Sequence, residues 1–193
     1  MSLAPWRSLI TRALHKNRSL VYSRYVQLAT VRENGLPANR TVVFRGFLED
    51  TNQLKFITDI RSAKAEQIPQ QPAAEICWYF PNSREQFRIS GNLILVTFNS
   101  HPHLQPARIK MWQELSDAAR LQFAWPTPGK ERVRTPEAFT PSAPNPLEPL
   151  ETFCLLLLEP TEVDYLELRG EPQNRTIYKL DENQEWDFEE INP

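Results

Sequence analysis

The stretch from residue 25 to residue 45 reads YVQLATVRENGLPANRTVVFR. We interpret residues 25–31 as a β-strand, with the period of two residues that is typical of a half-buried strand. Asn34-Gly35 favours the tight turn of a β-hairpin, because both residues tolerate positive φ. The chain is expected to continue as a strand over residues 40–45. This segment therefore predicts antiparallel strands, and it sets the fold class.

The rest of the chain continues as short strands separated by turns. Further strands are predicted over residues 54–58, 74–80, 86–98, 152–158, 163–168 and 176–180, followed by a polar tail that contains Trp186. Many short strands with few helices favour an antiparallel barrel over a parallel sheet. We therefore expect a mainly β protein with flanking helices, folded as a single domain over residues 1–193.

Three helices are expected to flank the barrel. An amphipathic helix is predicted at the N-terminus over residues 4–18, and the longest helix over residues 101–123. A short helix over residues 63–68 follows Ser62, whose hydroxyl is expected to accept a free N–H of the first turn. Seven of the 17 prolines lie between residues 125 and 150, which predicts one long proline-rich loop.

Composition excludes several classes of function. The net charge is −2, whereas nucleic-acid-binding domains are usually strongly basic. No apolar run is long enough to span a membrane, and the N-terminus lacks the apolar core of a secretory signal. The five glycines are too scattered for a Rossmann or P-loop phosphate motif. Two separated cysteines suit a reducing compartment, so we expect a cytoplasmic protein with no nucleic-acid or membrane partner.

No arrangement of residues indicates nucleophilic or metal-dependent catalysis. The histidines are His15, His101 and His103, and neither Cys77 nor Cys154 has a histidine nearby in the sequence. His101 and His103 lack a third ligand close by, so no metal site is expected. No side chain presents itself as a general base, and the catalytic residues stay unassigned.

One segment does predict a site for a terminal phosphate. Arg40 and Arg45 lie at opposite ends of one strand, Thr58 ends the next, and Ser62 and Lys64 open the short helix. Cationic and hydroxyl side chains beside free helical N–H groups suit a phosphate. An ordinary basic strand followed by a capped helix is the alternative interpretation.

Three motifs, in this order, resemble the pyridoxamine 5'-phosphate oxidase superfamily. They are RTVVFR (residues 40–45), FITD followed by SAKAEQI (56–59 and 62–68), and QFRISG (86–91). The resemblance covers residues 24–98 and resumes at Asn174-Arg175, where the family has Asp-Arg. It implies a six-stranded split β-barrel that binds FMN at the interface of a homodimer.

The resemblance also implies roles for individual residues. Arg40 and Lys64, assisted by Ser62, would hold the FMN phosphate, and Gln86 would hydrogen-bond the flavin ring. Arg175 would approach the ring from the partner subunit, and Trp125, at the start of the proline-rich loop, could stack on a flat ring or seal the dimer interface. The predicted cofactor site comprises Arg40, Thr41, Val42, Val43, Phe44, Arg45, Ile57, Thr58, Ser62, Ala63, Lys64, Gln86, Trp125 and Arg175.

Departures from the family pattern bear on the substrate. Ala63 replaces an arginine of the family's Ser-Arg-Lys, and Glu171 and Gln173 stand where the vitamin B6 oxidases carry Arg-x-His. An acidic residue there would repel a phosphorylated substrate. The family's substrate-phosphate residues would fall on Trp112, Ser116 and Arg120.

These departures favour an FMN-dependent oxidoreductase that acts on another small molecule, over a pyridoxamine 5'-phosphate oxidase. A flavin carrier or redox sensor without turnover is the alternative. A barrel that binds haem or a deazaflavin is a third, and the scarcity of histidine weakens haem.

Overall fold

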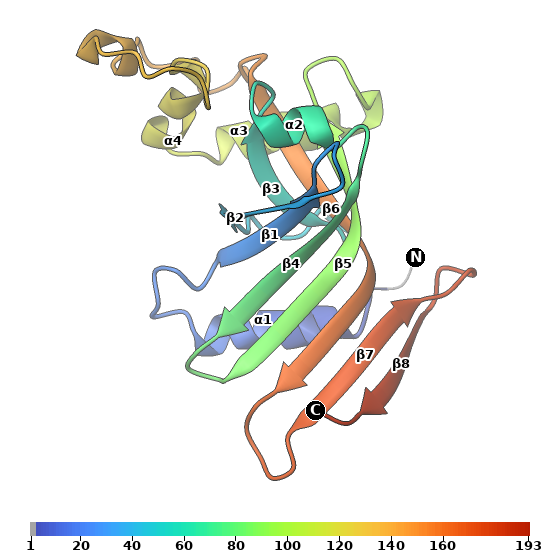
Figure 1. Cartoon of the computed structure of the whole chain (residues 1–193). Helices are drawn as coiled ribbons and strands as arrows, with labels where there is room; N and C mark the ends of the chain where they lie inside the picture. The colour runs from blue at the N-terminus through green and yellow to red at the C-terminus, as the bar shows by residue number, and fades with distance from the viewer. Residues whose placement is uncertain (1–2) are drawn as a thin grey trace.

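Eight strands form one antiparallel sheet in the computed structural model, which describes residues 3–193 (Figure 1). They are β1 (Tyr25–Val31), β2 (Pro37–Val43), β3 (Leu54–Asp59), β4 (Ala73–Phe80), β5 (Glu85–Val96), β6 (Phe153–Glu167), β7 (Asn174–Leu180) and β8 (Trp186–Ile191). The prediction of a mainly β, antiparallel fold is confirmed.

Six of these strands close into a ring. The order of pairing is β2-β1-β4-β5-β6, and β3 pairs with the first half of β6. Two backbone hydrogen bonds of 2.8 Å, from Arg45 N to Lys55 O and from Lys55 N to Gly46 O, join the end of β2 to β3. This ring is the expected six-stranded barrel. β7 and β8 extend the sheet from the second half of β6, so the described chain has two strands beyond the six of the expected barrel (Figure 1).

The prediction of separate strands over residues 152–158 and 163–168 is wrong, because β6 runs through Pro160 without a break. Pro160 pairs with Gly91 at the point where the register of β5 and β6 shifts. A proline is tolerated at such a bulge because the ladder does not need its missing N–H. Gly91 permits the close approach: a Cβ at this position would lie 2.0 Å from the carbonyl oxygen of Glu159.

Two of the three predicted helices are confirmed. They are α1 (Trp6–Lys16), which lies along one end of the barrel, and α2 (Ala63–Gln67), which lies across the other (Figure 1). The predicted single helix over 101–123 divides into a 3-10 turn (Pro102–Leu104), α3 (Gln105–Gln113), α4 (Asp117–Leu121) and a second 3-10 turn (Gln122–Ala124). The break occurs because the Ser116 hydroxyl accepts the N–H of Ala119 and so starts a new helix.

Two apolar cores hold these layers together. The first fills the barrel with aromatic side chains, including Phe44, Trp78 and Phe87, and extends under α1. The second lies between the other face of β6 and α3–α4, where Trp112, Phe123 and Phe153 make edge-to-face contacts. The second core fixes α4 at the same end of the barrel as α2.

The segment 125–150 is a loop, as predicted, apart from one 3-10 turn (Pro136–Phe139). The tail around Trp186, expected to be irregular, forms β8. Both cysteines are free thiols. No helix within residues 3–193 is long and apolar enough to cross a membrane.

Candidate functional site

A cavity of about 670 Å³ lies between the barrel and the start of the proline-rich segment. Its barrel wall comes from the ends of β2 and β3 and from α2; its outer wall comes from α4 and the residues that follow it. Six of the predicted cofactor residues line it: Val43, Arg45, Ile57, Thr58, Lys64 and Trp125. The volume falls in the range of small-molecule and cofactor sites.

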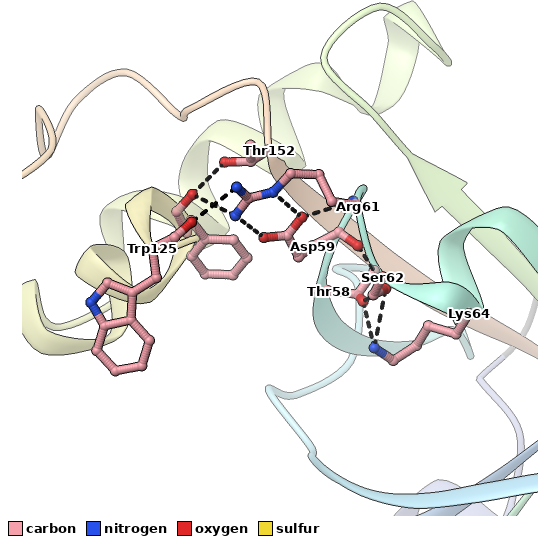
Figure 2. Close-up of polar contacts among 8 residues, drawn as sticks. Thr58, Asp59, Arg61, Ser62, Lys64, Trp125 and Thr152 are labelled. Atoms are coloured by element: carbon pink, nitrogen blue, oxygen red, sulfur yellow. Dashed lines mark hydrogen bonds and ion pairs between the residues drawn. The ribbon is translucent and has the colours of Figure 1, made fainter. Parts of the chain in front are cut away.

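Lys64 is the centre of a polar cluster at one end of this cavity (Figure 2). Its ammonium nitrogen donates to the hydroxyl of Thr58 at 2.9 Å and to that of Ser62 at 3.4 Å. The two hydroxyl oxygens lie 3.2 Å apart. Thr58 is 4% exposed, so the cluster is largely shielded from solvent. It offers one cation and two hydroxyls to an oxyanion.

The predicted capping role of Ser62 is wrong. Its hydroxyl makes no cap to α2 and instead donates to the carbonyl of Asp59 at 2.7 Å. Ser62 therefore tightens the turn between β3 and α2, and its oxygen remains an acceptor for Lys64.

Arg40 brings a second cation to the same end of the barrel. Its guanidinium donates to the Leu28 carbonyl at 3.1 Å and to the Thr30 hydroxyl at 2.8 Å. Burial first, and the charge of Arg40 second, lower the pKa of Lys64 from its ordinary value. Neither cation forms a salt bridge among residues 3–193. The Asp59 carboxylate offsets part of the charge effect on Lys64 without pairing with it, so both cations stay available to a phosphate monoester.

Successive residues of the segment 41–45 face either the first core or the opposite side of the sheet, where the cavity lies. Val43 and Arg45 line the cavity, whereas the Phe44 ring is buried in the first core, 4.9 Å from the ring of Trp78. The Phe44 side chain therefore does not line the cavity, and a contact of Phe44 with the flavin stays a prediction for its backbone alone. Val42 packs against the same core, and Thr41 is exposed on the outer face of the sheet.

Two buried donors in the cavity wall lack hydrogen-bond partners among the described residues. They are Nε of Arg45 and Nε1 of Trp125. Buried donors are normally satisfied, so each unsatisfied one calls for an explanation. A bound polar ligand would supply the acceptors, which fits a cofactor with carbonyl, hydroxyl and phosphate oxygens.

The sequence reasoning missed a pair of charged residues that organises this wall. The Asp59 carboxylate accepts from Arg61 Nε at 2.9 Å and from Arg61 Nη2 at 2.6 Å (Figure 2). The same guanidinium donates to the carbonyls of Trp125 at 2.9 Å and Phe123 at 3.2 Å. The sequence did show Asp59 and Arg61 two residues apart, directly before Ser62. That spacing gives no indication that Arg61 would contact residue 125.

Gln86 and Arg175 do not line this cavity. Gln86 lies on β5, three strand spacings or roughly 14 Å from β2. Arg175 lies on β7 and pairs with Asp164 at 2.9 and 3.1 Å. In the sheet register both residues pair with Leu166, so they share its outer face. Ala63 is exposed at the start of α2.

The predicted match of substrate-phosphate residues to α3 and α4 is wrong. Trp112 is fully buried in the second core, and Ser116 caps α4. Arg120 is buried and donates to the carbonyls of Trp112 and Leu115 at the end of α3. Glu171 and Gln173 lie in the loop between β6 and β7, beside Arg84 and away from the cavity.

Comparison with known proteins gives a consistent family. Residues 3–97 match the model of the family described as "Pyridoxamine 5'-phosphate oxidase, FMN-binding domain". A solved structure of a pyridoxamine 5'-phosphate oxidase-related, FMN binding protein from Nostoc punctiforme PCC 73102 is 70% identical, with a TM-score of 0.98 over the full length of both chains.

Two further similarities agree. Pyridoxine/pyridoxamine 5'-phosphate oxidase 2 of Arabidopsis thaliana is 41% identical over 172 residues, which is 86% of this chain and 85% of the plant protein. PhzG from Burkholderia lata 383 is 19% identical, with a TM-score of 0.79 over 100% of this chain and 98% of that one, and shares the fold. The chain is thus a member of the pyridoxamine 5'-phosphate oxidase-related family of split-barrel proteins, whose cofactor is FMN.

Proposed function

We propose that this protein is an FMN-dependent oxidoreductase that acts on a small molecule. The observation that carries the proposal is Lys64, which lines a cavity of about 670 Å³, forms no salt bridge among the described residues, and lies close enough to Arg40 for the charge of Arg40 to lower its pKa. The cavity has both an anion-binding end and an apolar wall formed by Val43, Ile57 and Trp125. A flavin mononucleotide has the matching shape: one phosphate at the end of a chain that carries a flat ring.

The residues divide into a phosphate group and a ring group. Lys64 and Arg40 would neutralise the phosphate, and the hydroxyls of Thr58 and Ser62 would bond its oxygens. The unsatisfied donors of Arg45 and Trp125 would meet the polar edges of the rest of the cofactor. The flavin supplies the hydride or electron transfer, so the protein needs no strong general base of its own.

We place the site at the interface of a homodimer, because part of the predicted cofactor set lies on a different face. Gln86 and Arg175 share the outer face of the sheet with Tyr25 and Tyr79, which are 48% and 47% exposed. Large exposed aromatic side chains are enriched in protein interfaces. A second copy packed on this face would bring Gln86 and Arg175 to the cofactor of its partner.

Pyridoxamine 5'-phosphate oxidation is less favoured, even though the plant relative carries that name. The resemblance aligns Glu171 and Gln173, an acid and a neutral amide, with the Arg-x-His of the vitamin B6 oxidases, and a second copy that brings Arg175 to the cavity would bring these neighbouring residues with it. We therefore expect no oxidation of pyridoxamine 5'-phosphate under air, whereas oxidation at a steady rate would make that the activity.

The first experiment is the visible absorbance spectrum of the purified protein, with mass spectrometry of what heat releases. Two flavin bands and the mass of FMN are expected. The double variant Arg40→Ala, Lys64→Ala should lose at least about a hundredfold in FMN affinity, since each charge-assisted contact contributes about 1.5–3 kcal/mol. Lys179→Ala, an exposed lysine on β7, is the matched control and should bind FMN normally.

Turnover is tested separately on the FMN-loaded protein. Reduction of the flavin by NAD(P)H, followed by reoxidation with an added acceptor, supports an enzyme. Bound FMN that neither NAD(P)H nor pyridoxamine 5'-phosphate reduces would refute the oxidoreductase and leave a flavin carrier. A protein that takes up no FMN would refute the whole proposal.

A further inference from the structure

The turn that connects β3 to α2 is joined to two parts of the cavity at once (Figure 2). On one side, Thr58 and Ser62 hold Lys64 in the anion-binding cluster. On the other, Arg61 reaches the carbonyl groups of Phe123 and Trp125, which are more than 60 residues away in the chain. One short turn therefore connects the phosphate end of the cavity to its aromatic wall.

Arg61 is held in a single orientation. Both oxygens of Asp59 accept from its guanidinium, and the first of them also accepts the backbone N–H of Arg61 at 2.8 Å. The Asp59 side chain is only 14% exposed and that of Arg61 only 25%. A two-pronged, half-buried contact of this kind fixes geometry better than a single ammonium can.

The carbonyl groups that Arg61 contacts lie at the C-terminal end of a helical segment. The 3-10 turn Gln122–Ala124 stops at Trp125, which is extended, and Pro126 offers no N–H to continue it. Carbonyls at such an end need donors from elsewhere. Arg61 supplies them for Phe123 and Trp125, and the Thr152 hydroxyl adds a bond of 2.8 Å to Phe123 (Figure 2).

Trp125 lines the cavity and accepts a hydrogen bond from this anchor. Its indole ring contacts Phe139, with ring centres 5.8 Å apart, and its Nε1 is buried without a partner among the described residues. The proline-rich segment that follows contributes the rest of the outer wall. Within residues 3–193, the hydrogen bond from Arg61 is the polar contact that joins Trp125 to the barrel.

We infer that Arg61 is a positioning residue: paired with Asp59, it holds Trp125 and the start of the proline-rich segment against the cofactor cavity. The inference rests on the proposed function, because it assigns a role toward bound FMN. It predicts that the Trp125 indole contacts the bound cofactor only while Arg61 holds the Trp125 carbonyl. The phosphate cluster does not need Arg61, since its contacts are made by Thr58, Ser62 and Lys64.

The test measures the part of the quenching of bound FMN fluorescence that depends on Trp125. That part is the difference between each protein and the same protein with Trp125→Phe. Wild type, Arg61→Ala and Arg61→Lys are compared, with Arg134→Ala, an exposed arginine of the same loop, as the matched control. Coupled residues give non-additive effects in such a cycle.

We expect Trp125→Phe to change the quenching in wild type and in Arg134→Ala, and to have no further effect in either Arg61 variant. The FMN dissociation constant of Arg61→Ala should rise by less than about tenfold, below the loss of one charge-assisted phosphate contact. An equal effect of Trp125→Phe in wild type and in Arg61→Ala would overturn the inference. Arg61→Lys keeps the positive charge but removes the guanidinium group that makes two hydrogen bonds to Asp59. It therefore tests the same contact if the alanine variant does not fold.

A second readout needs no cofactor and separates this inference from the proposed function. In the FMN-free protein, the fluorescence of Trp125 is obtained by subtracting the tryptophan emission spectrum of the Trp125→Phe variant from that of the protein that keeps Trp125. It should shift to the red and become more accessible to acrylamide in Arg61→Ala, and remain unchanged in Arg134→Ala. If wild type binds no FMN, the proposed function fails, and an unchanged Trp125 emission in Arg61→Ala would overturn the positioning role independently.

Discussion

Arg40 and Lys64 approach one another at the end of the barrel, and the charge of Arg40 lowers the pKa of Lys64. Burial is the larger cause of that shift, because it disfavours the charged ammonium. The structure thus holds two like charges close together and partly out of water. Such an arrangement costs stability in the free protein and becomes favourable when an anion binds between the charges.

The first prediction is a pH dependence of FMN binding. The ordinary pKa of a lysine is 10.5 and that of Lys64 is lower, so its ammonium loses its proton at a lower pH than a surface lysine does. FMN affinity should therefore fall as the pH rises through this lowered pKa, because a neutral amine does not neutralise a phosphate. A fluorescence titration of FMN at a series of alkaline pH values measures it.

Lys64→Arg is the control for titration of the flavin itself, since an arginine stays charged. An equal decline of affinity with pH in wild type and Lys64→Arg would contradict the assignment. The free protein should show the opposite trend. Its stability should rise with pH between the lowered pKa of Lys64 and the unfolded value, because only the unfolded chain holds the proton there.

The second prediction concerns the outer face of the sheet. Tyr79→Asp should weaken the proposed homodimer by about 2 kcal/mol or more, roughly thirtyfold in its dissociation constant, because a charge would replace an aromatic side chain that the second copy covers. Sedimentation at a series of concentrations measures it. Phe188→Asp is the matched control: this residue is 60% exposed, and its ring contacts Tyr178, which packs toward the first core from the opposite face. Equal dimerisation of Tyr79→Asp and wild type would place the interface elsewhere.

The third prediction tests the close approach of β5 and β6. Gly91→Ala should destabilise the fold by about 3 kcal/mol or prevent folding, because the new Cβ would lie 2.0 Å from the Glu159 carbonyl oxygen, and backbone cannot easily move there. Urea unfolding gives the free energy. Ser90→Ala, one residue earlier and partly exposed, should change it by less than about 1 kcal/mol.

The fourth prediction concerns the anchor at the end of the proline-rich segment. The buried Arg108 donates to the Phe153 carbonyl at 2.9 and 3.0 Å and to the Leu150 carbonyl at 2.7 Å. Arg108→Met should lower the free energy of unfolding by about 2–4 kcal/mol, since the buried carbonyls lose three hydrogen bonds and the Leu150 carbonyl keeps only the N–H of Phe153 as a donor. Thermal unfolding measures this change. Lys110→Met, on the exposed side of the same helix, should have little effect on the free energy of unfolding. Equal stability of the two variants would contradict this anchoring role.

Sequence alone determined the elements whose signals lie within a few residues. β1 has the predicted bounds, because residues rich in β-branched and aromatic side chains are followed closely by an Asn-Gly turn. The order of basic and hydroxyl residues from Arg40 to Lys64 likewise pointed to a phosphate site, and the structure brings Thr58, Ser62 and Lys64 together. Those residues belong to consecutive elements, so a short turn is enough to place them.

Tertiary structure decided what depends on residues far apart in the chain. The continuous strand through Pro160 and the strand at Trp186 each follow from pairing with another strand, which outweighs local preference. The same holds for Arg61. An arginine beside an aspartate is typical of an exposed ion pair, and only the folded chain brings it to the carbonyls of Phe123 and Trp125, two residues that line the cavity. Local pattern reports the period of an element, whereas the partner of a buried charge is fixed by how the elements pack.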